Sequence, residues 1–176
     1  MLRRWAERRL YRRTMQIAVS ELRRASRTPN ALEKLEALEV AEQKLRDAAW
    51  LDPEARQDRF LAGLTEIAKS RLRTLQEQAI PAVARLLDAA QTGAVDRAPM
   101  LDAAARLLSY LYHYIPDEPA VQELSARFRQ LGGVQRPYQA VTPLSEMYHR
   151  PPAGAGCTLV VVGLVAALLI TLILVR

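Results

Sequence analysis

The last residues of the chain place the strongest constraint on how it can fold. Residues 157–175, CTLVVVGLVAALLITLILV, carry no charge, and thirteen of these nineteen are Leu, Ile or Val. As a helix they would measure about 28 Å, close to the roughly 30 Å apolar core of a bilayer. Their side chains favour insertion by roughly 4 to 8 kcal/mol. The sequence therefore predicts one transmembrane helix. A buried core helix is the less favoured alternative, because no face of the segment is polar.

Basic residues predict the orientation of this span. Arg150 and the arginine-rich remainder of the chain precede it, whereas only Arg176 follows it. Positively charged flanks stay on the cytoplasmic side, so we expect a single-pass protein whose N-terminal domain is cytoplasmic. Insertion would have to follow synthesis, and in this arrangement the chain resembles tail-anchored membrane proteins, a class defined by topology. The Ala, Leu and Arg bias favours a bacterial plasma membrane. In a eukaryote, the endoplasmic reticulum or mitochondrial outer membrane would be the alternatives.

Small residues and a cysteine give the span two further features. Gly163 and Ala167 have the small-xxx-small spacing that lets two helices approach closely, so a homodimer packed through them is one hypothesis. Cys157 is the only cysteine and lies where palmitoylation can occur, although an unmodified thiol is the simpler expectation. One cysteine forms no internal disulfide, which agrees with a reducing compartment.

The rest of the chain is predicted to be all-α. Long stretches rich in Ala, Leu, Arg and Glu favour helices over strands. We expect about six helices, arranged as a helical bundle or as stacked helical hairpins, in addition to the transmembrane helix. The predicted order is a basic amphipathic helix at 1–29, a helical domain at 30–131, a Pro/Gly-rich linker at 132–156 and the anchor at 157–175.

Capping and breaking residues predict where the helices begin and end. Asn30 and Glu33 resemble a capping pair. Pro81 is expected to begin a new helix after the preceding one has ended, because proline suits the first helical position. Glycines at 93 and 132 are expected to terminate helices. The second to sixth helices are therefore predicted over about 31–51, 53–78, 81–93, 99–114 and 119–131.

Glutamates recur along the second predicted helix at a spacing of three residues. They alternate with leucines, as in an amphipathic helix. We interpret carboxylate pairs such as Glu33 and Glu36 as part of a solvated, charged face. The glutamates are Glu33, Glu36, Glu39 and Glu42, and the leucines are Leu32, Leu35, Leu38 and Leu45.

Two segments that end helices are similar to each other. AAWLDPEA at 48–55 and YHYIPDEPA at 112–120 lie about 65 residues apart, near twice the 34-residue period of tetratricopeptide repeats. WLDPEA is similar to the segment that closes the second helix of such a repeat, and RLLDAAQTG and ARFRQLGG resemble the ends of first helices. The resemblance covers residues 31–135. It implies stacked helical hairpins with a concave face for peptides or partner helices. An ordinary helical bundle is the alternative.

The first helix carries most of the positive charge. Nine arginines against two glutamates give residues 1–29 a net charge of +7. Three interpretations are open: a solvated or bundle-packed helix, a surface that lies on anionic headgroups with help from Trp5, Leu10 and Tyr11, and a nucleic-acid binder. The last is least favoured because the charge is confined to one helix and no recognisable nucleic-acid fold accompanies it. The expected membrane-surface residues are Arg4, Trp5, Arg8, Arg9, Arg12 and Arg13.

Catalytic and metal-binding motifs are absent from the sequence. It contains no GxSxG, GxxxxGK or dinucleotide fingerprint, and no Cys or His spacing that would hold zinc. His113, one turn before Asp117, could be a polarised base. Its place beside Tyr112 and Tyr114 favours a structural role instead. We therefore expect no enzyme, no cofactor and no metal, but a module that recruits protein partners at the bilayer. An unrecognised membrane-surface enzyme is the alternative.

Overall fold

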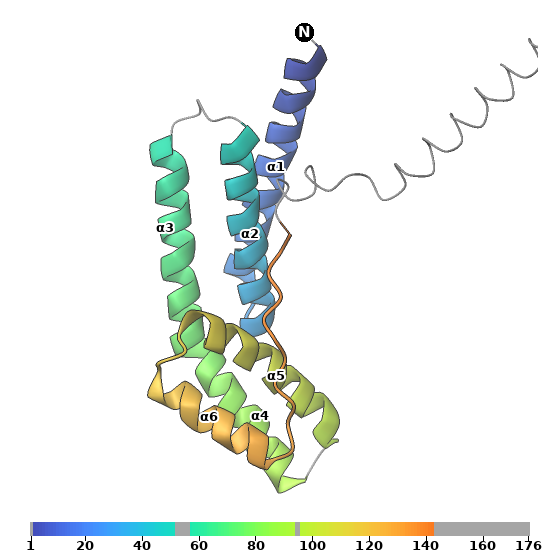
Figure 1. Ribbon diagram of the computed structural model, residues 1–176, viewed down its shortest axis with the longest axis vertical. Helices are drawn as coiled ribbons and strands as arrows, with labels where there is room; N and C mark the ends of the chain where they lie inside the picture. Colours follow the sequence, from blue (N-terminus) through green and yellow to red (C-terminus); the bar gives the residue numbers. More distant parts are fainter. Residues whose placement is uncertain (1, 52–56, 94–95, 143–176) are drawn as a thin grey trace, which may run out of the picture. The chain divides into compact units, whose positions relative to one another are not determined.

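The computed structural model describes residues 2–51, 57–93 and 96–142 (Figure 1). These residues are all-α and contain no strand, which confirms the predicted fold class for this part of the chain. The chain divides into two compact units, Met1–Val141 and Thr142–Arg176. The predicted anchor, Gly163 and Ala167 within it, Cys157 and most of the predicted linker lie outside the described residues.

Neighbouring helices pack on one another along the first unit. Helix α2 packs on both α1 and α3, α4 packs on α5, and α6 packs on α4 and α5 (Figure 1). The elements are α1 (Leu2–Arg27), α2 (Ala31–Leu51), α3 (Gln57–Thr74), the π-helical segment η1 (Leu75–Ala79), α4 (Ile80–Thr92), α5 (Arg97–Tyr114) and α6 (Pro119–Gln130).

Asn30 caps the start of α2, as predicted. Its side-chain Oδ1 accepts a hydrogen bond from the backbone N–H of Leu32 at 2.9 Å, satisfying one of the free donors at the helix N-terminus. The Glu33 carboxylate does not complete the expected reciprocal pair with Asn30. It accepts instead from the Thr28 hydroxyl at 3.0 Å, which fixes the short connection from α1.

Glycines end α4 and α6 for the predicted reason. Gly93 and Gly132 have φ values of 67° and 77°, a left-handed conformation that costs glycine little. After α6, the Gly132 N–H bonds to the Arg129 carbonyl and the Gly133 N–H to the Phe128 carbonyl, both at 2.9 Å. This pair of bonds is a Schellman motif, and it turns the chain back towards the helices.

Pro81 does not separate two helices as predicted. The helix runs on from α3 through η1 into α4, and the Ile80 N–H donates to the carbonyl of Leu75, five residues earlier. In α-helical geometry the Pro81 ring would meet the carbonyl of Glu77, and proline has no N–H to donate. The wider π-helical turn just before Pro81 lets the helix continue without that clash.

Two clusters of buried side chains form the core. The large-residue cluster lies among η1, α4, α5 and α6 and the start of α2, and its largest members include Leu108, Leu111 and Phe128. The alanine cluster lies between α1, α2 and α3. Five of its nine buried members are alanines, and the full set is Ala18, Ala25, Ala37, Leu38, Ala41, Leu45, Ala48, Phe60 and Ile67.

Residues 134–141 form an extended strap on the helices. This segment falls in the predicted linker at 132–156, yet Tyr138 packs against the large-residue cluster and the Val141 N–H bonds to Glu39 of α2. Figure 1 shows the strap running back past α5 towards α2. The Schellman turn at Gly132 reverses the chain, and the Tyr138 ring gains apolar burial by following the helices. The structure therefore differs here from an unattached linker.

Candidate functional site

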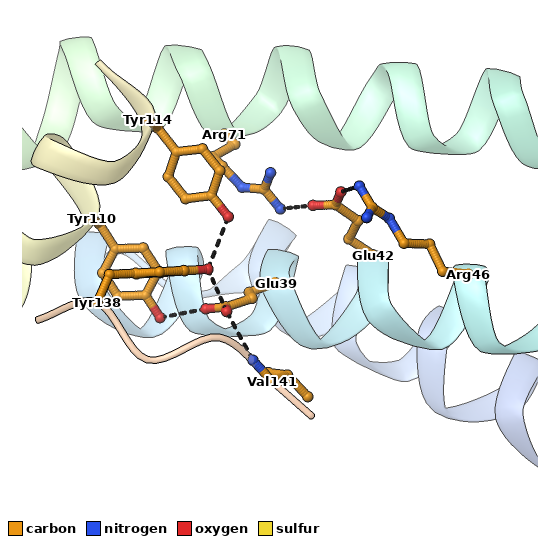
Figure 2. Close-up of polar contacts among 8 residues, drawn as sticks. All are labelled: Glu39, Glu42, Arg46, Arg71, Tyr110, Tyr114, Tyr138 and Val141. Carbon is orange, nitrogen blue, oxygen red and sulfur yellow. Dashed lines mark hydrogen bonds and ion pairs between the residues drawn. The ribbon is translucent and has the colours of Figure 1, made fainter. Parts of the chain in front are cut away.

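A buried carboxylate lies where the strap meets the helices. Glu39 of α2 is 6% exposed. The Tyr110 hydroxyl donates a hydrogen bond to Oε2 of Glu39 at 2.8 Å (Figure 2). The Tyr138 hydroxyl donates to Oε1, and the Val141 N–H donates to the same oxygen at 3.2 Å. A buried charge is costly unless its lone pairs are satisfied. Three donors from α5 and the strap stabilise this one.

Two tyrosines, Tyr110 and Tyr138, bond to Glu39, and Tyr114 bonds to Tyr138; we call these four residues the tyrosine cluster. Burial raises the pKa values of Tyr110 and Tyr138 above the ordinary tyrosine value. The hydrogen bond from each hydroxyl to Glu39 is the second-largest cause and acts in the same direction. Burial also raises the pKa of Tyr114, although the Tyr138 hydroxyl and the Arg71 charge act against it. Tyr114 and Tyr138 hydroxyls are 3.0 Å apart. All three hydroxyls therefore remain protonated donors at neutral pH.

An ion-pair network adjoins the tyrosine cluster. Arg71 of α3 is 6% exposed; its guanidinium pairs with Glu42 and lies over the Tyr114 ring, 4.4 Å from the centroid. Glu42 also pairs with Arg46 at 2.5 Å (Figure 2). Removing one partner of a buried pair is strongly destabilising, because the other charge is left uncompensated. This network links α2 and α3 beside the strap.

His113 packs on the tyrosines. Its ring stacks on Tyr138, with centroids 3.9 Å apart and planes at 11°, and meets Tyr114 edge-on at 4.6 Å. The side chain is exposed on one side and lines a pocket of about 290 Å³ that also borders Glu39 and Arg46. These contacts fit the structural role predicted for His113, with more exposure than a core residue has.

The interpretation of the α2 glutamates as one solvated face was wrong for Glu39. Glu33 is exposed, as expected, whereas Glu36 is half-buried and Glu39 is buried beneath the strap. Its partners Tyr110 and Tyr138 lie 71 and 99 residues further along the chain. No pattern local to α2 reports contacts at that separation. The one available signal was the group of aromatic residues at the end of α5.

The predicted membrane-surface arginines lie on the exposed side of α1. Arg8, Arg12 and Arg13 are exposed, and so is Arg9. Tyr11, expected to assist them, instead packs against the alanine cluster. The side chains of Arg4 and Trp5 lie outside the described residues. Three further exposed arginines lie at the end of the same helix and were not among the predicted membrane-surface residues: Arg23, Arg24 and Arg27.

A mainly apolar groove of about 580 Å³ opens where η1, α4 and α5 meet the start of α2. Aliphatic side chains cover most of its wall, and charged side chains such as Glu77 and Arg85 stand among them. Its residues could not be named from the sequence, because they come from four helical elements and from the connection that precedes α2. They are Pro29, Asn30, Ala31, Leu32, Glu77, Gln78, Ala82, Arg85, Leu86, Ala103 and Leu107.

Comparisons with known proteins add no relative. No protein-family model, curated protein or solved structure matches the chain. Among residues 2–51, 57–93 and 96–142, no helix has the length and hydropathy needed to cross a membrane. In the same residues, no three His, Cys, Asp or Glu side chains are grouped to hold a metal ion. The predicted anchor at 157–175 lies outside this part of the chain.

Proposed function

We propose that the chain is a membrane-tethered, cytosol-facing helical module that binds a protein partner. The observation that carries the tether is the uncharged run at 157–175, whose length and composition suit a bilayer. The larger basic flank on its N-terminal side supports a cytosolic location for the helices.

The groove supports binding of an apolar segment of a partner protein. Small side chains such as Ala82 and Ala103 leave room, and Leu86 and Leu107 supply apolar contact. Such a surface suits a helix that inserts a few apolar anchors. Successive helices that pack on one another, as α2 with α3 and α4 with α5, favour stacked hairpins as the architecture that forms this groove.

The strap limits how far the module lies from its tether. With Val141 held at Glu39, residues 142–156 separate the helices from the predicted span. These fifteen residues reach at most about 50 Å when fully extended, at ~3.3 Å per residue. A linker that began at residue 132 would reach about 80 Å. The contact between Val141 and Glu39 therefore shortens the chain that is available between the helices and the proposed span.

Photo-crosslinking from the groove tests the proposed binding. A photo-reactive amino acid placed at the exposed Glu77 of the full chain is expected to give a discrete adduct with a protein in membranes from the native cell. The same amino acid at Glu123, which is exposed on α6 and outside the groove, is the matched control. Mass spectrometry of the adduct identifies the partner and the segment that is bound.

A second pair of variants shows whether the groove itself is responsible. Ala103→Arg fills the groove and is expected to abolish the Glu77 adduct, whereas Ala126→Arg on exposed α6 surface should leave it unchanged. Circular dichroism of each variant establishes that the helices are intact. Equal adducts from both crosslinking positions, or an adduct that survives Ala103→Arg, would contradict the proposal.

A further inference from the structure

The exposed side of α1 carries two groups of arginines, one near each end of its described part, with the uncharged Gln16, Val19 and Ser20 between them. At about 100° per residue, seven arginines fall on the arc opposite the buried Thr14, Ala18 and Ala25. From Arg8 to Arg27 this face is roughly 28 Å long. The two glutamates of α1 lie towards the buried arc, and one of them, Glu21, pairs with Arg24 at 3.2 Å. We call the set the arginine face: Arg8, Arg9, Arg12, Arg13, Arg23, Arg24 and Arg27.

The apolar side of α1 is already occupied. Tyr11, Met15 and Leu22 pack against the alanine cluster, and alanines of α2 allow the two helices to lie close together. On the outer side, Val19 is the exposed large apolar residue, at 42%. An interfacial helix normally buries its apolar face in the acyl boundary. The described side chains of α1, from residue 7 onward, leave no such face on the outer side, so binding through them would be electrostatic.

We propose that the arginine face docks on the anionic phospholipid headgroups of the membrane that holds the tether. This proposal rests on the proposed tether for its choice of partner. Charge complementarity favours anionic lipid, since each arginine near such a surface strengthens binding roughly fivefold. The strap ends at Val141 on α2, the helix on which α1 packs. The fifteen residues from Val141 to the proposed span reach at most about 50 Å, so the tether limits how far α2 can move from the membrane.

The tether distinguishes a lipid partner from a nucleic acid. Nucleic-acid phosphates would also complement arginines. The tether, however, holds the arginine face and the headgroups on one membrane, so their binding is intramolecular and the effective headgroup concentration is high. The arginine face also lies on a single helix, and the described residues form no recognisable nucleic-acid-binding fold around it. Anionic lipid is therefore the partner to which the proposal commits.

Energy transfer in reconstituted vesicles tests the docking. The full chain, with Cys157→Ser and Ser20→Cys, carries a donor dye on the outer side of α1, and the vesicles carry an acceptor on a headgroup. Vesicles of phosphatidylcholine are compared with vesicles that also contain phosphatidylglycerol. Transfer is expected to be higher in the anionic vesicles and to fall when salt shortens the Debye length. A dye at Ala126→Cys on α6 is the positional control.

Charge variants show whether the arginine face is responsible. Arg12→Glu with Arg23→Glu and Arg27→Glu should abolish the increase in anionic vesicles. Neutral Arg→Gln changes at the same three positions should weaken docking on the order of 100-fold, at roughly fivefold for each arginine. If charge reversal unfolds α1, these neutral variants replace the reversed ones in the test. The matched control reverses three exposed arginines on α3 and α6, outside the groove, and should leave the increase intact: Arg59→Glu, Arg73→Glu and Arg129→Glu.

The outcomes separate failure of docking from failure of the tether. Equal transfer at position 20 in neutral and anionic vesicles, or an increase that survives the arginine-face variants, overturns the proposal. Binding of duplex DNA without any lipid-dependent transfer also overturns it, in favour of a nucleic acid. Release of the chain from neutral vesicles by carbonate would defeat the tether alone. In that case, a higher transfer in anionic vesicles at neutral pH and low salt would still support docking.

Discussion

The two halves of the helical unit are packed in different ways. Leucines and Phe128 fill the large-residue cluster, whereas alanines predominate where α1 lies on α2. Apolar burial contributes in proportion to area, so the large-residue cluster holds more of the free energy of folding. Alanines instead let α1 and α2 lie close together, but they bury less apolar surface area. Close packing on α2 therefore positions α1, and the arginines of α1 lie on its outer side.

Removing Phe128 should have the largest effect on stability. Its ring is 2% exposed in the large-residue cluster, and Phe128→Ala removes the ring and leaves a cavity. We expect the free energy of unfolding to fall by about 3 to 5 kcal/mol. Denaturant unfolding of the full chain in mild detergent, followed by circular dichroism at helix wavelengths, measures it. A loss under about 1 kcal/mol would show that this cluster is not the main source of stability.

Enlarging an alanine tests the close approach in the other half. Ala41 of α2 is fully buried in the alanine cluster, so Ala41→Leu should force α1 and α2 apart. Overpacking of this kind costs about 1 to 3 kcal/mol. The same substitution at the exposed Ala126 is the control and should change stability by less than about 0.5 kcal/mol. If Ala41→Leu stabilised the chain, the description of this interface as tightly packed would be wrong.

Where the helices begin and end was predicted from neighbouring residues better than which helices contact one another. Asn30, Gly93 and Gly132 act on backbone groups within a few residues, so their effects could be seen in the sequence. The π-helical turn before Pro81 could not, because packing on both sides keeps the helix continuous. Nor could the docking of Tyr138 on Glu39, which depends on a contact 99 residues apart. The groove and the tyrosine cluster are both built from such distant segments.

The tyrosine cluster connects the two halves, and a single hydroxyl tests that connection. Tyr138→Phe keeps the ring on the large-residue cluster but removes its bond to Glu39. We expect a loss of about 1 to 2 kcal/mol, because a hydrogen bond to a charged group is lost. The strap should also become more sensitive to limited proteolysis. Tyr112→Phe, at another half-buried tyrosine of α5, is the control for the substitution itself.

The raised tyrosine pKa values predict a smaller effect that depends on pH. Tyr110, Tyr114 and Tyr138 keep their protons in the folded state to higher pH than in the unfolded state, where tyrosine titrates near pH ~10. Their contribution to stability is therefore complete below about pH 10 and is lost as pH rises further. Each ionising tyrosine adds a slope of up to ~1.4 kcal/mol per pH unit.

Comparison of two chains isolates the Tyr138 contribution. Unfolding free energies of the wild-type chain and of Tyr138→Phe should converge as pH is raised from about 9 to about 11, because phenylalanine does not titrate. Wild type should show the steeper decline. Parallel curves would mean that the Tyr138 hydroxyl is not held in the buried, protonated form that the structure describes.

Carbonate extraction of the full chain tests the central claim, a tether at 157–175, most directly. The wild-type chain should remain in the membrane pellet at alkaline pH. Leu164→Arg with Leu168→Arg should release it, because each arginine at the centre of a span costs about 2.5 to 3.5 kcal/mol. The matched Leu164→Ile and Leu168→Ile pair should not. Recovery of the wild-type chain in the soluble fraction would contradict the account.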